Sequence, residues 1–156
     1  MLDGSLFSPA LDGIGVIVNG SLNYNSLKNE NGDPLTMDGS SGRANNLTAY
    51  YERNGLSARI SQRYRSAYQA MERDWAFNPV FRQRPSEKVV DLQFGYAFES
   101  GPMKGLSLVL QVYNATDEVA VTYKTPNHGA ADQGAFLPNF ITYFGRQVQF
   151  GLNYKL

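Results

Sequence analysis

The stretch QVQFGLNYKL, residues 147–156, alternates polar and apolar side chains without exception. Its apolar members are Val148, Phe150, Leu152, Tyr154 and Leu156, and each residue between them is polar or glycine. Successive side chains of a β-strand point to opposite faces of a sheet, whereas a helix would mix the two sets. The stretch therefore predicts a strand with one wholly apolar face.

The same period of two extends back to residue 142 and recurs in five further segments. These segments cover residues 14–25, 46–53, 55–69, 87–99 and 105–118. Each is about as long as the ~9–11 residues that a tilted strand needs to cross a bilayer. Strands of soluble proteins average only ~5–6 residues. The sequence predicts an all-β fold, an antiparallel meander of about six long strands of the transmembrane type.

Short and long connections alternate between these segments. Asn54-Gly55, the strongest short signal for a hairpin, joins one pair, and residues 100–104 join another. The long connections cover residues 26–45, 70–86 and 119–140. Outer-membrane barrels have short periplasmic turns and long extracellular loops. The pattern therefore predicts that the chain end and the short turns lie on the periplasmic side.

Composition excludes several classes of protein. The chain has no Cys and one His, which excludes a disulfide scaffold, a thiolate metal site and a cluster of His ligands. Fourteen basic and fourteen acidic residues balance, so the charge excess of a nucleic-acid binder is missing. No nucleophile, base and orienting group form a recognisable set, so we expect neither an enzyme nor a cofactor. No basic segment of a secretory signal precedes residue 15. A hydropathy plot would class the chain as soluble, but membrane barrels give only a weak signal per strand.

The two faces of the predicted strands differ in chemistry. Charged residues share the polar face with small ones, whereas aromatic residues lie near the strand ends of the apolar face, where lipid-facing barrels carry aromatic girdles. The charged residues are Glu52, Arg59, Arg63, Arg65, Asp91 and Lys155, and the aromatic ones are Tyr24, Tyr51, Tyr64, Tyr68, Phe98 and Tyr154. The alternative is a soluble antiparallel domain with the same aromatic residues in its core.

Candidate ligand-binding residues are few. Arg59, Arg63 and Arg65 form a stripe that either contacts an anion in the lumen or pairs with carboxylates such as Glu52 and Asp91, and we favour the pairing. Aromatic residues of the long connections either stack on a ligand or pack the loops; they are Trp75, Phe77, Phe81, Phe136 and Phe140. The candidates retained are Arg59, Arg63, Asp91 and Trp75, and His128 is expected to be a solvated loop residue.

Three segments resemble motifs of TonB-dependent outer-membrane receptors. Residues 50–59 (YYERNGLSAR), followed by Tyr64 and Arg65, resemble a paired-strand motif of this family. Residues 110–118 (LQVYNATDE) are similar to its N-L-T-D segment, with Ala in place of Leu, and residues 143–156 resemble its last barrel strand. Residues 11–16 fit the start of a barrel strand. The resemblance covers nearly the whole chain, in the order of the family.

The resemblance implies a 22-stranded barrel with an N-terminal plug that takes up a large scarce nutrient such as a siderophore, cobalamin or an oligosaccharide. Residues 1–156 would then be the C-terminal barrel segment in the outer membrane of a Gram-negative bacterium, without the plug, the TonB box and the signal peptide. Its partners would be outer-membrane lipid, the rest of the barrel and plug, the TonB complex through the missing N-terminal part, and the barrel assembly machinery. That machinery would recognise the terminal strand, through Phe150, Leu152, Tyr154 and Leu156.

Physical constraints leave other forms open. Six strands with the curvature of a wide barrel cannot close, and open edges do not persist in hydrocarbon. The chain therefore needs the rest of a barrel, further copies of itself, or a rearranged smaller fold. The alternative function is a soluble or self-associating small β-barrel that binds a ligand or forms a passive pore.

Overall fold

The computed structural model describes residues 2–3, 12–28, 30–32, 37–73, 75–124 and 137–155, and these residues form only strands, turns and loops. None of them belongs to a helix long and apolar enough to span a membrane. The strands are β1 (Leu2–Asp3), β2 (Ile14–Leu22), β3 (Arg43–Arg53), β4 (Leu56–Arg65), β5 (Tyr68–Arg73), β6 (Pro79–Arg84), β7 (Glu87–Ala97), β8 (Leu106–Tyr113), β9 (Ala120–Lys124), β10 (Leu137–Thr142) and β11 (Gln147–Tyr154).

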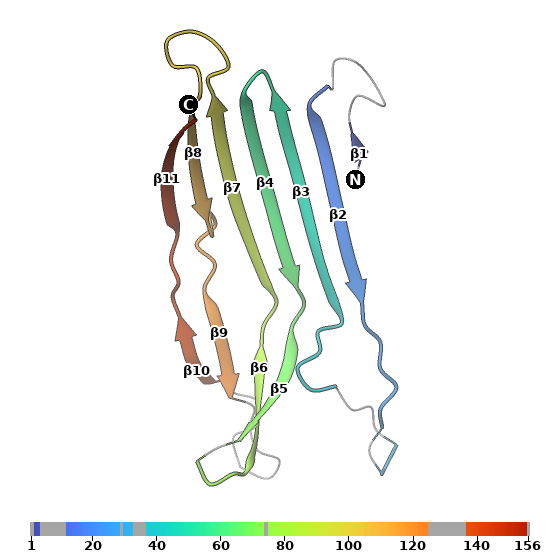
Figure 1. Ribbon diagram of the computed structural model, residues 1–156. Helices are drawn as coiled ribbons and strands as arrows, with labels where there is room; N and C mark the ends of the chain where they lie inside the picture. Colours follow the sequence, from blue (N-terminus) through green and yellow to red (C-terminus); the bar gives the residue numbers. More distant parts are fainter. Residues whose placement is uncertain are drawn as a thin grey trace.

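The described strands form two antiparallel sheets. The larger has the order β1-β2-β3-β4-β7-β8-β11, and the smaller has the order β10-β9-β6-β5. The smaller sheet prolongs four strands of the larger one, because β5 follows β4, β6 precedes β7, β9 follows β8 and β10 precedes β11 in the same lateral order (Figure 1). The predicted all-β antiparallel meander is therefore confirmed, with β1 as an additional two-residue edge strand.

The two ends of the molecule differ as the connection lengths predict. The β3–β4 turn, the β7–β8 turn and the end of β11 lie at one end, and the β5–β6 turn and the end of β9 lie at the other (Figure 1). Asn54 and Gly55 form the β3–β4 turn with φ of 51° and 77°. A Cβ atom on Gly55 would lie 2.2 Å from the carbonyl oxygen of Ala97, so both the turn and the neighbouring strand require glycine here.

Two of the predicted long loops contain β-strands, so the predicted extent of these loops is wrong. Residues 70–86 are mostly the β5–β6 hairpin, paired from Tyr68↔Arg84 to Arg73↔Pro79. Residues 119–140 contain β9 and the first part of β10. The predicted strand over residues 105–118 ends at Tyr113, and a turn follows it. The paired strands extend further into the connections than predicted, because short breaks interrupt the alternation and hide its continuation.

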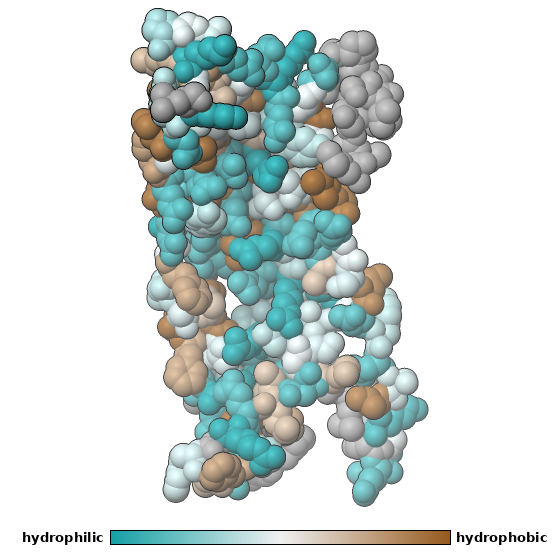
Figure 2. Space-filling view, viewed as in Figure 1, coloured by the Kyte–Doolittle hydropathy of each residue, from teal (hydrophilic) through white to brown (hydrophobic). Residues whose placement is uncertain are grey.

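The apolar residues form continuous rows across the large sheet. One row runs from β2 to β11 through Ile14, Tyr51, Ala58, Phe94, Leu110 and Phe150. The next row runs through Val16, Ala49, Ile60, Leu92, Val112 and Val148. We call this surface the apolar face and the opposite surface the polar face. Figure 2 views the polar face, with hydrophilic residues over its middle.

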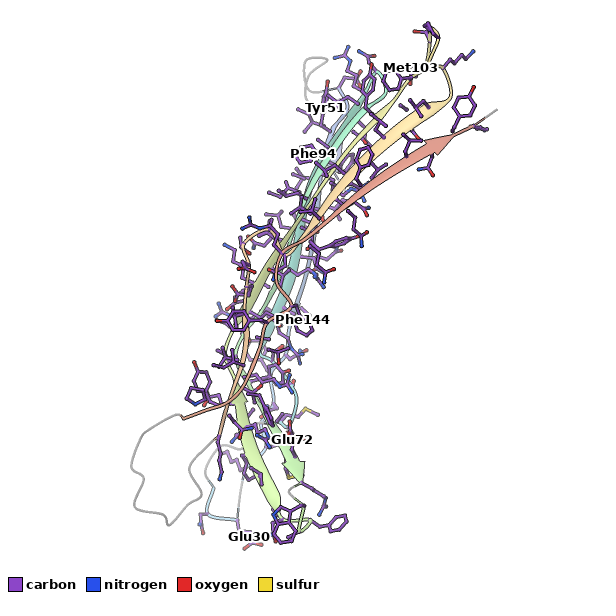
Figure 3. The ribbon with its side chains drawn as sticks, turned by 90° about the vertical axis from the view of Figure 1, so that its left-hand side faces the viewer. Glu30, Tyr51, Glu72, Phe94, Met103 and Phe144 are labelled. Atoms are coloured by element: carbon purple, nitrogen blue, oxygen red, sulfur yellow. The ribbon has the colours of Figure 1, made fainter. Side chains whose placement is uncertain are left out.

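No second layer covers the apolar face among the described residues. None of their hydrophobic side chains is buried, and Val18, Phe94 and Phe150 are 67%, 47% and 68% exposed. Figure 3 shows the molecule from the side as one layer of strands. The described strands also do not close: β11 pairs with β8 alone, and β1 pairs with β2 only at Gly15 and Val16. A soluble sandwich buries such a face against a second sheet, and the described residues provide none.

The alternation changes phase between the two sheets. The guanidinium carbon of Arg65 lies 3.9 Å from the centroid of the Tyr68 ring, and both residues line one hollow with Arg84 and Glu87. Tyr68 therefore lies on the polar side, although the sequence predicted it on the apolar face. The breaks at residues 66–67 and 85–86 shift the phase by one residue. The apolar face consequently continues through the alternate residues Met71, Phe81, Val121, Tyr123 and Ile141.

Candidate functional site

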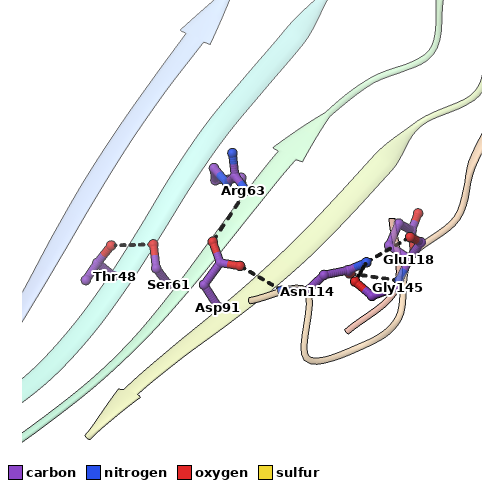
Figure 4. A network of polar contacts seen from close by, with 7 residues as sticks. All are labelled: Thr48, Ser61, Arg63, Asp91, Asn114, Glu118 and Gly145. Atoms are coloured by element: carbon purple, nitrogen blue, oxygen red, sulfur yellow. Dashed lines mark hydrogen bonds and ion pairs between the residues drawn. The ribbon is translucent and has the colours of Figure 1, made fainter. Parts of the chain in front are cut away.

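A network of polar contacts crosses the polar face where the two sheets join (Figure 4). The Arg63 guanidinium lies 3.4 Å from Asp91 Oδ2. The other carboxylate oxygen of Asp91 accepts a hydrogen bond from the backbone N–H of Asn114, at 3.0 Å. Asp91 therefore links β4 and β7 to the turn that follows β8.

Asn114 holds this turn together. Its Oδ1 accepts from the Glu118 N–H at 2.8 Å, and its Nδ2 donates to the Glu118 carbonyl at 3.0 Å. The same Nδ2 lies 3.5 Å from the carbonyl of Gly145, in the break between β10 and β11. The φ angles of Asn114 and Asp117 are 51° and 56°, a region that Asn and Asp enter more readily than other non-glycine residues. The segment similar to N-L-T-D thus joins two strand breaks.

The network borders an open hollow of about 410 Å³. The hollow is lined by both charged and aromatic residues, with three carboxylates and one guanidinium among them. They include Arg63, Glu87, Asp91, Tyr113, Glu118 and Phe144. Both oxygens of Asp91 have partners, and Glu118 Oε1 lies 3.4 Å from the Lys88 N–H. The hollow therefore combines a fixed polar wall with exposed Phe144, whose side chain Figure 3 labels.

The three arginines of the stripe have two different roles. Arg59 pairs with Glu52 at 3.7 Å, and Arg63 pairs with Asp91, so the favoured pairing is what the structure contains. These ion pairs are largely exposed, and such pairs contribute about 0–1 kcal/mol each. Arg65 instead donates to the Gly39 carbonyl at 2.8 Å and to Ser41 Oγ at 3.2 Å. Arg65 therefore fixes the connection that precedes β3 and has no carboxylate partner among the described residues.

The structure does not bring Trp75 to the other candidates. Trp75 lies in the β5–β6 turn and is 94% exposed, at the end opposite to the short turns. Phe77, in the same turn, has φ of 62°, and Arg73 Nη1 donates to its carbonyl at 3.0 Å. Phe81 and Phe140 lie in β6 and β10. Phe136 and His128 lie outside the described residues.

The terminal strand β11 presents its apolar side chains without cover. Val148, Phe150, Leu152 and Tyr154 are each about three-fifths or more exposed and stand opposite Val112, Leu110, Leu108 and Leu106 of β8. Leu156 lies outside the described residues. The geometry provides a long edge strand with one apolar side.

The described residues contain no group of three or more His, Cys, Asp or Glu side chains that could hold a metal ion. No protein-family model, curated protein or solved structure matches the chain. The polar network, the hollow and the terminal strand are the features of the described residues that bear on function.

Proposed function

We propose that the chain is the C-terminal barrel segment of a TonB-dependent outer-membrane receptor. Such a receptor takes up a large scarce nutrient: a siderophore, cobalamin or an oligosaccharide. The observation that carries the proposal is the single layer of long strands with one continuous apolar face and no hydrophobic core among the described residues.

The uncovered apolar side chains support a lipid environment for this face. Fully burying a Leu, Val or Phe side chain contributes about 1.5–3 kcal/mol relative to leaving it exposed. Val148, Phe150 and Leu152 are 63%, 68% and 60% exposed on one strand alone. Lipid acyl chains cover such a face without a second protein layer, and the closed barrel satisfies the strand edges. Outer-membrane lipid and the rest of the barrel are therefore the proposed partners.

Strand length supports an extension beyond the bilayer. The path from Leu56 through β4 and β5 to Arg73 reaches ~60 Å at ~3.3 Å per residue, whereas the apolar band of an outer-membrane barrel is ~25 Å tall. The small sheet continues the large one at the end opposite to the β3–β4 and β7–β8 turns. We place this end outside the cell and the short turns in the periplasm.

The terminal strand has a separate role in the proposal. Its exposed residues Phe150, Leu152 and Tyr154, with Leu156 after them, form the segment that the barrel assembly machinery recognises. The plug would lie in the lumen, and the TonB complex would act through the N-terminal part of the receptor. The polar face, with the Arg63–Asp91 pair, would line the lumen.

One observation favours a second candidate, a passive pore made by self-association. Among the six long strands, β2 and β11 are the outermost and run in opposite directions, and β1 covers β2 only at Gly15 and Val16. The β11 strand of one copy can therefore pair antiparallel with β2 of another, with both apolar faces on the same side.

The two candidate functions predict different gene sequences and different masses of the gene product. We would sequence the DNA upstream of Met1 and determine the mass of the native product in outer-membrane fractions. A frame that continues upstream into a plug, with a product of receptor size, supports the proposal. A product of the size of this chain, with a start codon at Met1 and a conductance in planar bilayers, contradicts it and favours the self-associated pore.

A further inference from the structure

The polar side of the small sheet carries an excess of positive charge. Alternation places Arg82, Arg84 and Lys124 on this side, and Glu72 is the one carboxylate that accompanies them on the described residues of β5, β6, β9 and β10. Glu72 forms an ion pair with Arg82 through Nε, and its other oxygen lies 3.8 Å from Arg84 Nη2. One carboxylate is therefore shared by two guanidinium groups, and Lys124 has no ion pair among the described residues.

Two of these cations stand directly opposite each other. Arg82 and Lys124 are Cα partners in the pairing of β6 with β9. Directly opposite side chains have Cβ atoms ~4.5–5.5 Å apart, and like charges at such positions destabilise a sheet. A local conflict of this kind is expected at functional sites, where binding a ligand of opposite charge removes the repulsion.

The Arg82 guanidinium is mostly buried and incompletely bonded. Its side chain is only 17% exposed, and the Phe140 ring centroid lies 5.1 Å from its central carbon. Within the described part of the chain, neither Nε nor Nη1 makes a directed hydrogen bond, despite the ion pair with Glu72. A buried donor without an acceptor is costly. Arg82 Nε and Nη1 are closed off from solvent, so the groups that meet a ligand are the half-exposed Arg84 guanidinium and the exposed Lys124 ammonium, which match a carboxylate or a phosphate.

We infer that Arg82, Arg84 and Lys124 form a binding site for a soluble oxyanion, a carboxylate or a phosphate. The site lies on the polar side of the sheet, so a ligand from water reaches it without crossing the apolar face. The phosphate of a lipid headgroup has the same chemistry, but lipid would lie against the opposite, apolar face. A lipid headgroup is therefore not the proposed ligand. The inference concerns binding alone and does not depend on the receptor proposal.

The test is isothermal titration calorimetry with the protein in zwitterionic detergent at low salt. The probes are tricarballylate, a soluble tricarboxylate, and inorganic pyrophosphate. Lys124→Gln removes one exposed cation from the site, and Lys104→Gln removes one from the turn at the opposite end. We expect Lys124→Gln to weaken binding about tenfold or more, the loss of one charge-assisted hydrogen bond. Lys104→Gln should leave the affinity unchanged.

Three results would overturn the inference. They are the absence of binding of both probes, an equal loss in the two variants, and binding only to vesicles that contain an anionic lipid. Arg84→Lys is a second variant, which retains the charge but loses the exposed guanidinium fork. It should weaken binding of both probes while circular dichroism reports an unchanged strand content. The assay measures binding to the purified protein. If the protein proved to be soluble in the cell, the receptor proposal would be refuted, but the measured binding would still stand.

Discussion

Replacing Asn114 with Ala should destabilise the protein by about 3 kcal/mol. The two hydrogen bonds between the Asn114 side chain and Glu118 contribute about 1 kcal/mol each. The φ of 51° adds about 1 kcal/mol, because Ala enters the left-handed region less readily than Asn. Asn114→Gly also loses the two hydrogen bonds, but glycine adopts a positive φ without steric cost. This variant should therefore cost about 2 kcal/mol.

Asn54 provides the matched control. Its φ is also 51°, but its side chain has no hydrogen bond with another described residue, so Asn54→Ala should cost only about 1 kcal/mol. The assay is equilibrium unfolding in urea from detergent, followed by circular dichroism of the strands. An Asn114→Ala variant that loses no more stability than Asn54→Ala would refute the role assigned to the side-chain network.

Three further predictions test packing, the apolar face and assembly. A Cβ atom on Gly15 would lie 2.2 Å from the Tyr50 ring, so Gly15→Ala should cost about 1–3 kcal/mol, and adding Tyr50→Ser should restore most of it in a double-mutant unfolding cycle; equal losses in the single and double variants would contradict this. Phe150→Arg should destabilise the protein in lipid vesicles by about 2–4 kcal/mol, and its neighbour Gln149→Arg should cost far less; equal costs would show that the two faces meet the same solvent. Deleting residues 154–156 should reduce the amount of assembled, heat-modifiable protein in outer-membrane fractions, and normal assembly would remove the terminal strand from the recognition signal.

The large sheet could be predicted because the alternation of polar and apolar residues is enough to identify its strands and their two faces. In β11 and β4 the period of two continues for the whole strand, and Asn54-Gly55 marks the turn by its backbone preference. Register then follows, because a slip by one residue would move every apolar side chain to the polar face.

The small sheet could not be predicted in the same way. The break at residues 66–67 shifts the phase, so Tyr68 and Met71 exchange the faces that an uninterrupted alternation would give them. In β5 and β6, charged residues such as Glu72 and Arg82 follow apolar ones without a regular pattern, which is typical of a loop. β6 also pairs with β9, which is far away in the sequence.

The candidate site was predicted only in part. Opposite charges on neighbouring strands predicted the pairing of Arg63 with Asp91. The bonds of Asn114 to Glu118 and Gly145 were missed, although an Asn followed three residues later by Asp117 is a turn signal that could have indicated them. Trp75 was grouped with the arginines by residue type alone, and the β5–β6 hairpin carries it to the far end.

The most direct test of the membrane-wall proposal is the environment of neighbouring residues in lipid vesicles. The sequence has no Cys, so Phe94→Cys, Gln93→Cys, Leu110→Cys and Gln111→Cys each introduce one site for a nitroxide label. Phe94 stands opposite Leu110, and Gln93 stands opposite Gln111. The account predicts that labels at 94 and 110 contact oxygen dissolved in the lipid and are shielded from a water-soluble nickel complex. Labels at 93 and 111 should be accessible to the nickel complex and contact little of the oxygen in the lipid. Labels at 94 and 110 that are shielded from both, or all four labels equally exposed to nickel, would contradict it.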